Sequence, residues 1–398
     1  MSVIDKKYAD MFANSAAWYE RGKNAFAGGV THQSRFVAPF PTYYEWADGP
    51  FKYDVDGNEI VDYVMGNGSL LLGHNPKSVM DAINTQMGKG THLGGATTHE
   101  TRYAEAVKRN MPKLDSVRFT SSGTESTLLA MRIARGYTGK DKIIKFYEHF
   151  HGWQDYATID SGQSTGGIPK ATLDQIIVLQ ADIKAVDNVL SQRDDVAGVI
   201  VECNGAHFGT FPLQNPTFLH DLQETCRKHN VMFIMDEVIT GFRLSKGGAQ
   251  ERWDLDPDIT TMAKIMAGGQ PGAAVGGKKH VMDVMAKTGD PLHDSTKRVA
   301  QAGTYNAQPT AAVAGIAHLD DIWNTNVIEL ADSAALRLKE GINDAFAKNE
   351  ITGHAHGISS LVQVNMGYDC DCDRNICTMP FDEIYRSMPN EKTGALKR

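Results

Sequence analysis

An acidic pair, Asp236 and Glu237, follows five apolar residues in the stretch VMFIMDEVITGFR. The apolar run predicts a strand that is buried on both faces, with Asp236 at its carboxyl end. In an open parallel sheet, ligands bind beside the carboxyl ends of the strands. A buried carboxylate is costly unless it meets a cation or several hydrogen-bond donors, so we expect a partner for Asp236.

Two nucleotide-binding interpretations of this strand lack the loop that each requires. An apolar run ending in Asp-Glu resembles a Walker B strand, but the sequence has no phosphate loop of the form GxxxxGK[ST]. The stretch TGKD at 138–141 lacks both the leading Gly and the Ser or Thr. A dinucleotide-binding GxGxxG fails as well, because GNGSLLLG has Leu71 where the third Gly is needed.

The protonated ring nitrogen of pyridoxal phosphate (PLP) is a cation that suits a single buried carboxylate. This interpretation requires a lysine for a Schiff base, a phosphate-binding turn and an aromatic platform. Lys264 lies in ITTMAKIMAGG, where its apolar neighbours would desolvate the amine, lower its pKa and make it nucleophilic.

The phosphate-binding turn and the platform also have candidates. The stretch FTSSGTES places Ser122, Gly123 and Thr124 between a strand and a helix, where backbone N–H groups and the helix dipole can hold a phosphate. In FYEHFHGW, Phe150 or Trp153 could stack on a ring. Each feature also has an ordinary structural explanation, such as a helix N-cap or core packing. Their order and spacing together favour the PLP site.

Composition and charge exclude several other function classes. The formal charge of −8 over 398 residues, without a basic run, argues against nucleic acid or an anionic membrane as the main partner. The first residues, MSVIDKKYADMF, are charged where a secretory signal needs an apolar core, so we expect a cytoplasmic location. The five cysteines suggest no disulfide framework. The cluster of Cys370, Cys372 and Cys377 lacks the second pair of a zinc site, and we expect no metal.

Short apolar runs rich in Val, Ile and Phe alternate with longer helical patterns, as is typical of βαβ units. We expect an α/β fold with a doubly wound, mostly parallel sheet between helices. The expected elements are strands at 116–120, 142–146, 197–202 and 231–236, and helices at 124–137 and 216–230.

The flanking segments predict a second, smaller α+β domain. The stretch FKYDVDGNEIVDYV predicts a hairpin that turns at Asp56-Gly57. A helix is expected over 326–349, followed by the strand-like SSLVQVNM. We therefore expect a large cofactor-binding domain at 60–310, with 1–59 and 311–398 forming the smaller domain.

Several motifs together resemble the class III (fold type I) PLP-dependent aminotransferases, in particular their glutamate-1-semialdehyde 2,1-aminomutase-like branch. The resemblance runs from about Gly28 to the end of the chain. It rests on GGVTHQSRF, YDVDGNEIVDYV, LLGHNP, SSGTEST, FHGW, MDEVITGFR, MAKIMAGG and GTYNAQP.

The resemblance implies a role for each candidate residue. Lys264 would form the Schiff base and move the proton, and Asp236 would pair with the pyridine nitrogen. The cofactor ring would lie between Val238 and Phe150. The remaining cofactor contacts implied in the same chain are Ser122, Gly123, Thr124 and His151.

The family pattern also implies a homodimer with shared active sites. Gly303 and Thr304 would reach the phosphate of the neighbouring subunit's cofactor. Arg35 falls where the branch has an arginine that holds the substrate carboxylate, which suits a guanidinium fork.

Two departures from the aminomutase pattern fall in the implied substrate pocket. Asn67 stands where the branch has a tryptophan, and His207 lies near the position of an expected asparagine. Both would change the substrate rather than the cofactor chemistry. The chain ends at EKTGALKR, where family members usually continue, so substrate contacts from that segment are not assigned.

The sequence therefore predicts an aminotransferase that moves an amino group between an amine and a keto or aldehyde acceptor through a Lys264 Schiff base. The alternatives are an intramolecular aminomutase, an amino-acid racemase or epimerase, and a non-catalytic cofactor-binding scaffold or regulator. Retention of Lys264, Asp236 and the phosphate-binding turn weighs against the scaffold.

Overall fold

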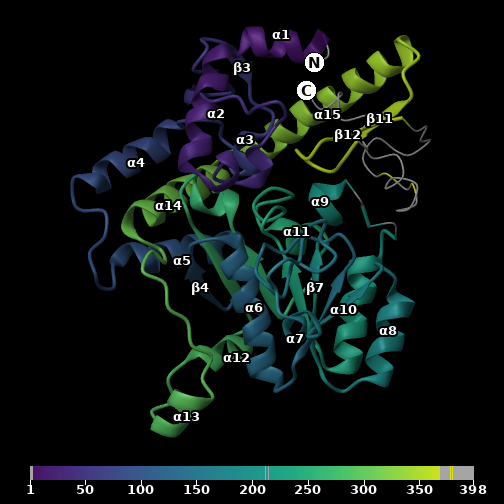
Figure 1. Cartoon of the computed structure of the whole chain (residues 1–398). Coiled ribbons are helices and arrows are strands. Elements are labelled where there is room, and N and C mark those ends of the chain that lie inside the picture. Colours follow the sequence, from purple (N-terminus) through teal and green to yellow (C-terminus); the bar gives the residue numbers. More distant parts are fainter. Residues whose placement is uncertain (1–2, 211, 214, 368–376, 378, 380–398) are drawn as a thin grey trace. The chain divides into compact units, whose positions relative to one another are not determined.

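The computed structural model describes residues 3–210, 212–213, 215–367, 377 and 379 (Figure 1). These residues form two compact units, one of residues 3–66 and 72–77 and one built from 67–71 and the residues from 78 onward. Cys370 and Cys372 lie outside the described residues, whereas Cys377 is buried. The domain division expected at residues 59 and 310 stays a prediction.

The first unit combines N-terminal helices with a small antiparallel sheet. Its elements are α1 (Val3–Met11), α2 (Ala13–Ala25), η1 (Ala27–Gly29), η2 (Gln33–Arg35), β1 (Tyr44–Asp48), β2 (Phe51–Asp54) and β3 (Glu59–Val61). The short helix α3 (Met65–Gly68) follows and has residues in both units. The predicted hairpin is confirmed, since β2 and β3 pair antiparallel and Gly57 has a φ of 88°. The Asp54 carboxylate accepts the N–H groups of Asp56 and Asn58 at 3.0 and 2.8 Å, which holds the turn.

The second unit is built on a seven-stranded sheet with the order β4-β10-β9-β8-β7-β5-β6. The strands are β4 (Ser116–Thr120), β5 (Lys142–Phe146), β6 (Ile176–Leu179), β7 (Val196–Glu202), β8 (Met232–Asp236), β9 (Ile259–Met262) and β10 (Ala273–Gly277). Neighbours from β6 to β9 pair in parallel, and β10 is antiparallel to both β4 and β9. The predicted mostly parallel sheet is confirmed.

The four strands expected from apolar runs are present, within one residue at each end. The prediction left out β6, β9 and β10. Strands β9 (ITTM) and β10 (AAVGG) are short and rich in Thr, Ala and Gly, so they carry little of the apolar signal by which a buried strand is recognised.

Helices cover both faces of this sheet. On one face lies α6 (Gly123–Thr138), and on the other lie α8 (Ile183–Gln192) and α10 (Phe218–His229) (Figure 1). Successive strand residues point to opposite faces. In β8, Ile234 packs in the α6 core, whereas Phe233 and Met235 pack in the α8 and α10 core. Burial of each large apolar side chain of this kind stabilises the fold by about 1.5–3 kcal/mol relative to leaving it exposed.

A third core joins α5 (Thr98–Asn110) and α14 (Pro309–Asn324) to η3 (Lys264–Ala267), the short turn that carries Lys264. Its centre includes Tyr103, Met266 and Leu319, all buried. The expected C-terminal helix is confirmed as α15 (Val327–Lys348), followed by the hairpin of β11 (Gly353–His356) and β12 (Gln363–Met366). The other helices are α4 (Lys77–Met87), α7 (Lys170–Leu173), α9 (Ala206–Gly209), α11 (Gly248–Arg252), α12 (Lys279–Met282), η4 (Asp283–Met285) and α13 (Pro291–Thr296).

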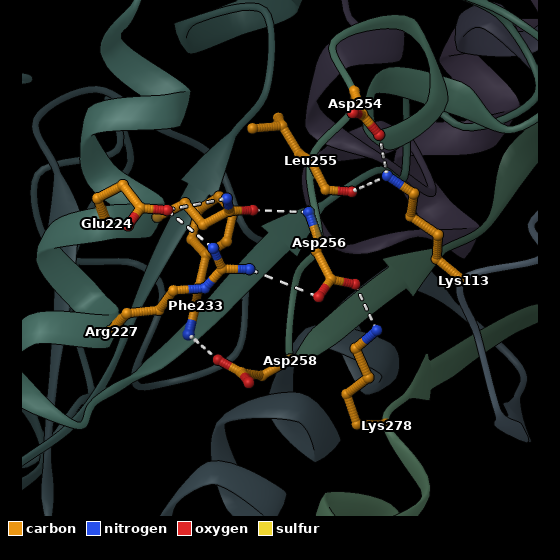
Figure 2. A network of polar contacts seen from close by, with 10 residues as sticks. Lys113, Glu224, Arg227, Phe233, Asp254, Leu255, Asp256, Asp258 and Lys278 are labelled. Carbon is orange, nitrogen blue, oxygen red and sulfur yellow. Dashed lines mark hydrogen bonds and ion pairs between the residues drawn. The ribbon is translucent and has the colours of Figure 1, made fainter.

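A network of polar contacts lies at the amino ends of β8 and β9 (Figure 2). Asp258 accepts the N–H of Phe233 at 2.8 Å, and Asp256 forms ion pairs with Lys278 and, at 3.5 Å, with Arg227. These contacts fix the loop between α11 and β9. They lie at the end of the strands opposite to Asp236.

Within the described part of the chain, no helix is both long and apolar enough to cross a membrane. The same residues contain no group of three or more His, Cys, Asp or Glu arranged to hold a metal ion.

Candidate active site

Asp236 ends β8 on the α6 face of the sheet and is only 5% exposed. Its Oδ2 atom accepts a hydrogen bond from His151 Nδ1 at 2.7 Å. Its Oδ1 atom accepts from Thr261 Oγ1 at 3.0 Å and from the Val238 N–H at 3.1 Å. A carboxylate oxygen can accept two hydrogen bonds, so Oδ2 keeps capacity for one more donor. The carboxylate is thus oriented by three donors and can still receive a ring N–H.

His151 holds Asp236 without adding a charge. The contact with Asp236 requires the proton on Nδ1, and the buried Nε2 atom has no hydrogen-bond partner among the described residues. Burial lowers the pKa of His151, although the hydrogen bond to Asp236 acts in the opposite direction. The neutral His151 ring therefore orients the Asp236 carboxylate without neutralising it, so the negative charge can pair with a cation.

Lys264 begins η3, two residues after β9, with its backbone in the left-handed region at a φ of 53°. A non-glycine residue pays about 1–3 kcal/mol for such a conformation. Burial lowers the pKa of its amine, the carboxylates of Asp236 and Glu202 raise it, and the Arg243 guanidinium lowers it further. The net decrease enlarges the neutral, nucleophilic fraction of the amine.

Two buried side chains hold the turn that carries Lys264. His318 Nδ1 donates to the Ile265 carbonyl at 2.6 Å, and the Tyr103 hydroxyl donates to the Met266 carbonyl at 2.9 Å. Tyr103 comes from α5 and belongs to the third core, and His318 is buried on α14, which packs in that core. The packed helices therefore set the position of the lysine backbone.

The stretch that is expected to bind phosphate lies at the N-terminus of α6. Ser122 is the N-cap, and its Oγ atom accepts the Glu125 N–H at 3.3 Å. The first N–H groups of a helix have no intrahelical acceptor, so those of Gly123 and Thr124 can bind an anion. A Cβ on Gly123 would lie 3.2 Å from Val238 and 3.6 Å from Ala263. This close approach brings the helix start beside both Asp236 and Lys264.

The loop of residues 147–153 packs on the same helix start. Gly152 has a φ of 92°, and a Cβ there would lie 2.6 Å from Thr124 Oγ1, so only glycine allows this approach. Phe150 precedes it, and its side chain is 36% exposed. An aromatic side chain that is open to solvent on a fixed loop can serve as the expected platform.

Glu202 is a residue that the sequence analysis missed. It ends β7, is paired in register with Asp236 and accepts the Phe150 N–H at 2.5 Å. Its place at the end of a buried strand was the available signal. Thr261, His318 and Tyr103 were missed as well. Their contacts with Asp236 and with the Lys264 turn leave no local trace in the sequence.

The predicted substrate residues have different surroundings. His207 Nε2 lies 2.8 Å from Glu148 Oε2, and both residues have a left-handed backbone with φ values of 52° and 62°. Asn67 is exposed, and the Gly68 carbonyl next to it accepts a hydrogen bond from Arg243. Burial lowers the pKa of Arg243 to about 10.

The structure does not connect two other predicted site residues, Arg35 and Thr304, with the groups around Asp236 and Lys264. Arg35 belongs to the first unit, is exposed and donates to Thr31 Oγ1 at 2.6 Å. Thr304 follows Gly303 in a turn of the second unit, and its carbonyl lies 2.7 Å from His92 Nε2. Substrate binding by Arg35 and a contact of Thr304 with a second subunit stay predictions.

Taken together, the second unit presents one carboxylate with a remaining acceptor position, one amine of lowered pKa, a helix start suited to phosphate and a half-open aromatic ring. These groups fit the ring nitrogen, aldehyde, phosphate and ring face of PLP.

Known proteins support the same conclusion. The family model for class III aminotransferases matches residues 32–379. Over 389 residues the chain is 36% identical to a glutamate-1-semialdehyde 2,1-aminomutase from Sulfolobus acidocaldarius, covering 94% of this chain and 90% of that protein.

Two solved structures have the same fold. An omega-transaminase from Sphaerobacter thermophilus has a TM-score of 0.85 and 31% identity, with 95% of this chain and 86% of that chain covered. A transaminase solved with PLP bound has a TM-score of 0.82 and 30% identity, with coverages of 89% and 84%. The chain therefore belongs to the class III aminotransferases, which are PLP-dependent enzymes of fold type I.

Proposed function

We propose that this protein transfers an amino group from an amine donor to a keto or aldehyde acceptor and that Lys264 carries the reaction. The observation that supports this most directly is the approach of three segments within one unit. A Cβ on Gly123 would lie within 3.6 Å of both Val238 and Ala263, the neighbours of the acid and the amine.

Lys264 acts as nucleophile and as proton carrier. PLP, when bound, withdraws electrons from the substrate carbon that loses its proton. The Lys264 amine must be neutral to accept that proton, and burial favours the neutral form. Because η3 fixes the lysine backbone, the amine can return the proton from the same position.

Asp236 would hold the protonated ring nitrogen of the cofactor in its charged form, and His151 and Thr261 hold the Asp236 carboxylate in one orientation. The N–H groups of Gly123 and Thr124 would hold the phosphate, with Ser122 fixing the helix start as its N-cap. The side chains that would enclose and shield the ring from water are Phe150 and Val238.

Of the three proposed substrate residues, Arg35 matches the aminomutase pattern, whereas His207 and Asn67 depart from it. We propose that Arg35 grips a substrate carboxylate with its guanidinium fork. His207, paired with Glu148, and Asn67 make the pocket more polar than the pattern predicts. These residues favour a carboxylated substrate with a further polar group.

A glutamate-1-semialdehyde 2,1-aminomutase activity is the second candidate, because the relative from Sulfolobus acidocaldarius has this name. An aminomutase uses the same lysine and acid but keeps one substrate in the pocket. A racemase or epimerase would also use Lys264 as the proton carrier. The active unit in each case is proposed to be a homodimer in which Gly303 and Thr304 complete the partner's phosphate site.

A donor screen followed by an acceptor test separates these activities. PLP-loaded protein is mixed with one amino donor at a time, and the visible absorbance follows conversion of the cofactor from its aldehyde to its amine form. Pyruvate or 2-oxoglutarate should then restore the aldehyde form. Lys264→Ala should lower the rate by at least about 100-fold.

Isomerisation of a single substrate without an external acceptor would support the aminomutase and overturn the aminotransferase proposal. Loss of substrate chirality without amino transfer would support the racemase or epimerase. A Lys264→Ala variant as active as the parent protein would refute the role of Lys264 in every case.

A further inference from the structure

Glu202 and Asp236 form a pair of buried carboxyl groups at the carboxyl ends of β7 and β8. They are register partners in the parallel ladder, so both side chains leave the sheet on the α6 face. Glu202 is 4% exposed and Asp236 is 5% exposed. Two ionised carboxylates at this spacing and burial would repel each other strongly.

The partners of the two carboxyl groups differ. Asp236 accepts hydrogen bonds from His151, Thr261 and the Val238 N–H. Among the described residues, the donors to Glu202 are two backbone N–H groups, that of Phe150 at 2.5 Å and that of His207. In the part of the chain that the structure describes, Glu202 is in no ion pair. The donors therefore support a negative charge on Asp236 better than on Glu202.

Two titratable residues near Glu202, Lys145 and His149, make no ion pair with its carboxyl group. Lys145 of β5 donates to the carbonyls of Ala157 and Ile159 at 3.0 and 2.6 Å, and burial lowers its pKa to about 8. His149 accepts the Glu202 N–H on Nδ1 at 3.0 Å, and burial holds its pKa well below 6.5. The other titratable groups around Glu202 are Asp236 of β8, Lys264 of η3, Cys203, and the Glu148–His207 pair.

We propose that Glu202 holds a proton at neutral pH, so that the pocket offers the single negative charge of Asp236 to the cofactor ring and to Lys264. The pKa of Glu202 is raised to about 8, mainly by burial and also by the charge of Asp236, while the Phe150 N–H and Lys264 act in the opposite direction. Only the effect on Lys264 rests on the proposed function. Glu202 is thus a positioning residue that acts through the amine.

Loss of this proton has a defined consequence. An ionised Glu202 would add a second negative charge near Lys264 and raise the pKa of its amine. The amine would then stay protonated to higher pH and could not accept a proton from the substrate. The protonated carboxyl group also keeps its carbonyl oxygen as the acceptor for the Phe150 N–H, which holds the loop of residues 147–153.

The first test uses the protein without cofactor, so it does not depend on the proposed function. Thermal unfolding midpoints of the parent and Glu202→Gln are compared from about pH 5 to about pH 9. The folded pKa of about 8 lies above the ordinary value of 4.5, so the unfolded chain ionises Glu202 first and the parent loses stability as pH rises between these values. Gln cannot ionise, so the midpoint of Glu202→Gln should rise relative to the parent across this range.

Glu105→Gln on the exposed face of α5 is the matched control and should show a constant difference from the parent. A constant difference for Glu202→Gln would mean that Glu202 is ionised throughout and would overturn the proposal. If this variant does not fold, infrared spectra of the parent can still refute the proposal. The absorption of protonated carboxyl groups should decrease as the pH rises to about 9, and its absence at neutral pH would mean that Glu202 is ionised.

The second test uses the PLP-loaded enzyme and measures activity and visible absorbance against pH. The parent should show a step near pH 8 that Glu202→Gln lacks. Glu202→Asp keeps a titratable group and should restore a pH-dependent step. A step that persists unchanged in Glu202→Gln would show that Glu202 does not act on Lys264, even if the unfolding test succeeds.

Discussion

Asp236 and Glu237 are adjacent in the chain but serve different parts of the fold. Successive residues of a strand point to opposite faces, so the Asp236 side chain faces the candidate active site while the Glu237 side chain points away from it. Glu237 accepts the N–H groups of Ala249 and Gln250 at 2.6 and 3.1 Å and the Thr240 hydroxyl at 2.9 Å. It therefore caps α11, and burial raises its pKa.

Because the two carboxylates serve different parts of the fold, isosteric substitutions of Asp236 and Glu237 should affect different properties. Asp236→Asn removes the charge that is proposed to face the ring nitrogen, and loss of a charged hydrogen bond of about 1.5–3 kcal/mol should weaken PLP binding by roughly 10- to 100-fold. Glu237→Gln replaces one carboxylate oxygen by an NH2 group, so one N–H group of α11 loses its acceptor, and the free energy of unfolding should fall by about 1–3 kcal/mol. PLP titration and denaturant unfolding measure the two effects.

Asp236→Asn should unfold close to the parent protein, and Glu237→Gln should retain its turnover per folded molecule. If both variants lost PLP affinity equally, the two carboxylates would not be separated by function as their geometry indicates.

At the scale of elements, the position of Lys264 depends on helices that are distant in the sequence. The side chains of His318 in α14 and Tyr103 in α5 hold consecutive carbonyls of η3. Gly268 ends the turn with a φ of 58°, and a Cβ there would lie 2.6 Å from the Ala314 carbonyl. The turn is therefore fixed from its carbonyls and from its last residue.

His318→Leu should lower kcat by about tenfold or more with little change in the substrate KM, because the lysine backbone loses a restraint while the substrate contacts remain. His318→Asn can still donate to the Ile265 carbonyl and should recover most of the activity. Failure of Asn to recover more activity than Leu would mean that His318 contributes by packing alone.

The loss of stability at acidic pH provides an independent test of the burial of His318. Burial lowers the pKa of His318 below 6.5, so the unfolded chain binds this proton first as the pH falls. The parent protein should lose stability below about pH 6.5, and part of that loss should be absent in His318→Asn.

At the scale of the whole molecule, the family resemblance predicts that two chains share each active site. In this chain the turn after Gly303 is tied to His92 through the Thr304 carbonyl, and the adjacent Tyr305 is 62% exposed. An exposed aromatic beside a proposed phosphate contact suits a surface that a second copy covers.

Mixed dimers of Lys264→Ala and Thr304→Ala test this sharing. If Thr304 completes the partner's site, one of the two sites in each mixed dimer carries neither change. Random reassociation of equal amounts should then recover about a quarter of the parent activity. Light scattering checks that dimers form, and no recovery above the separate variants would refute a shared site.

From the sequence one could predict the alternation of strands and helices and the hairpin at Gly57, and one could propose the acid, the lysine and the SSGT turn as parts of a cofactor site. These features are local. Apolar runs reveal β5, β7 and β8, and the motifs around Asp236 and Lys264 are contiguous. Strands β9 and β10 were missed because their Thr, Ala and Gly residues are buried by neighbours rather than marked by hydrophobicity.

Only the folded chain brings Glu202 beside Asp236, places His151 on the same carboxylate and seats His318 on the Lys264 turn. Glu202 and Asp236 are 34 residues apart along the chain, and His151 and Asp236 are 85 apart. His318 and the Ile265 carbonyl that it contacts are 53 residues apart. No local sequence pattern encodes contacts over such separations. Strand register and helix packing determine which groups meet. The charge and proton balance of the pocket is therefore a property of the tertiary structure, although the chemistry of its principal residues is visible in the sequence.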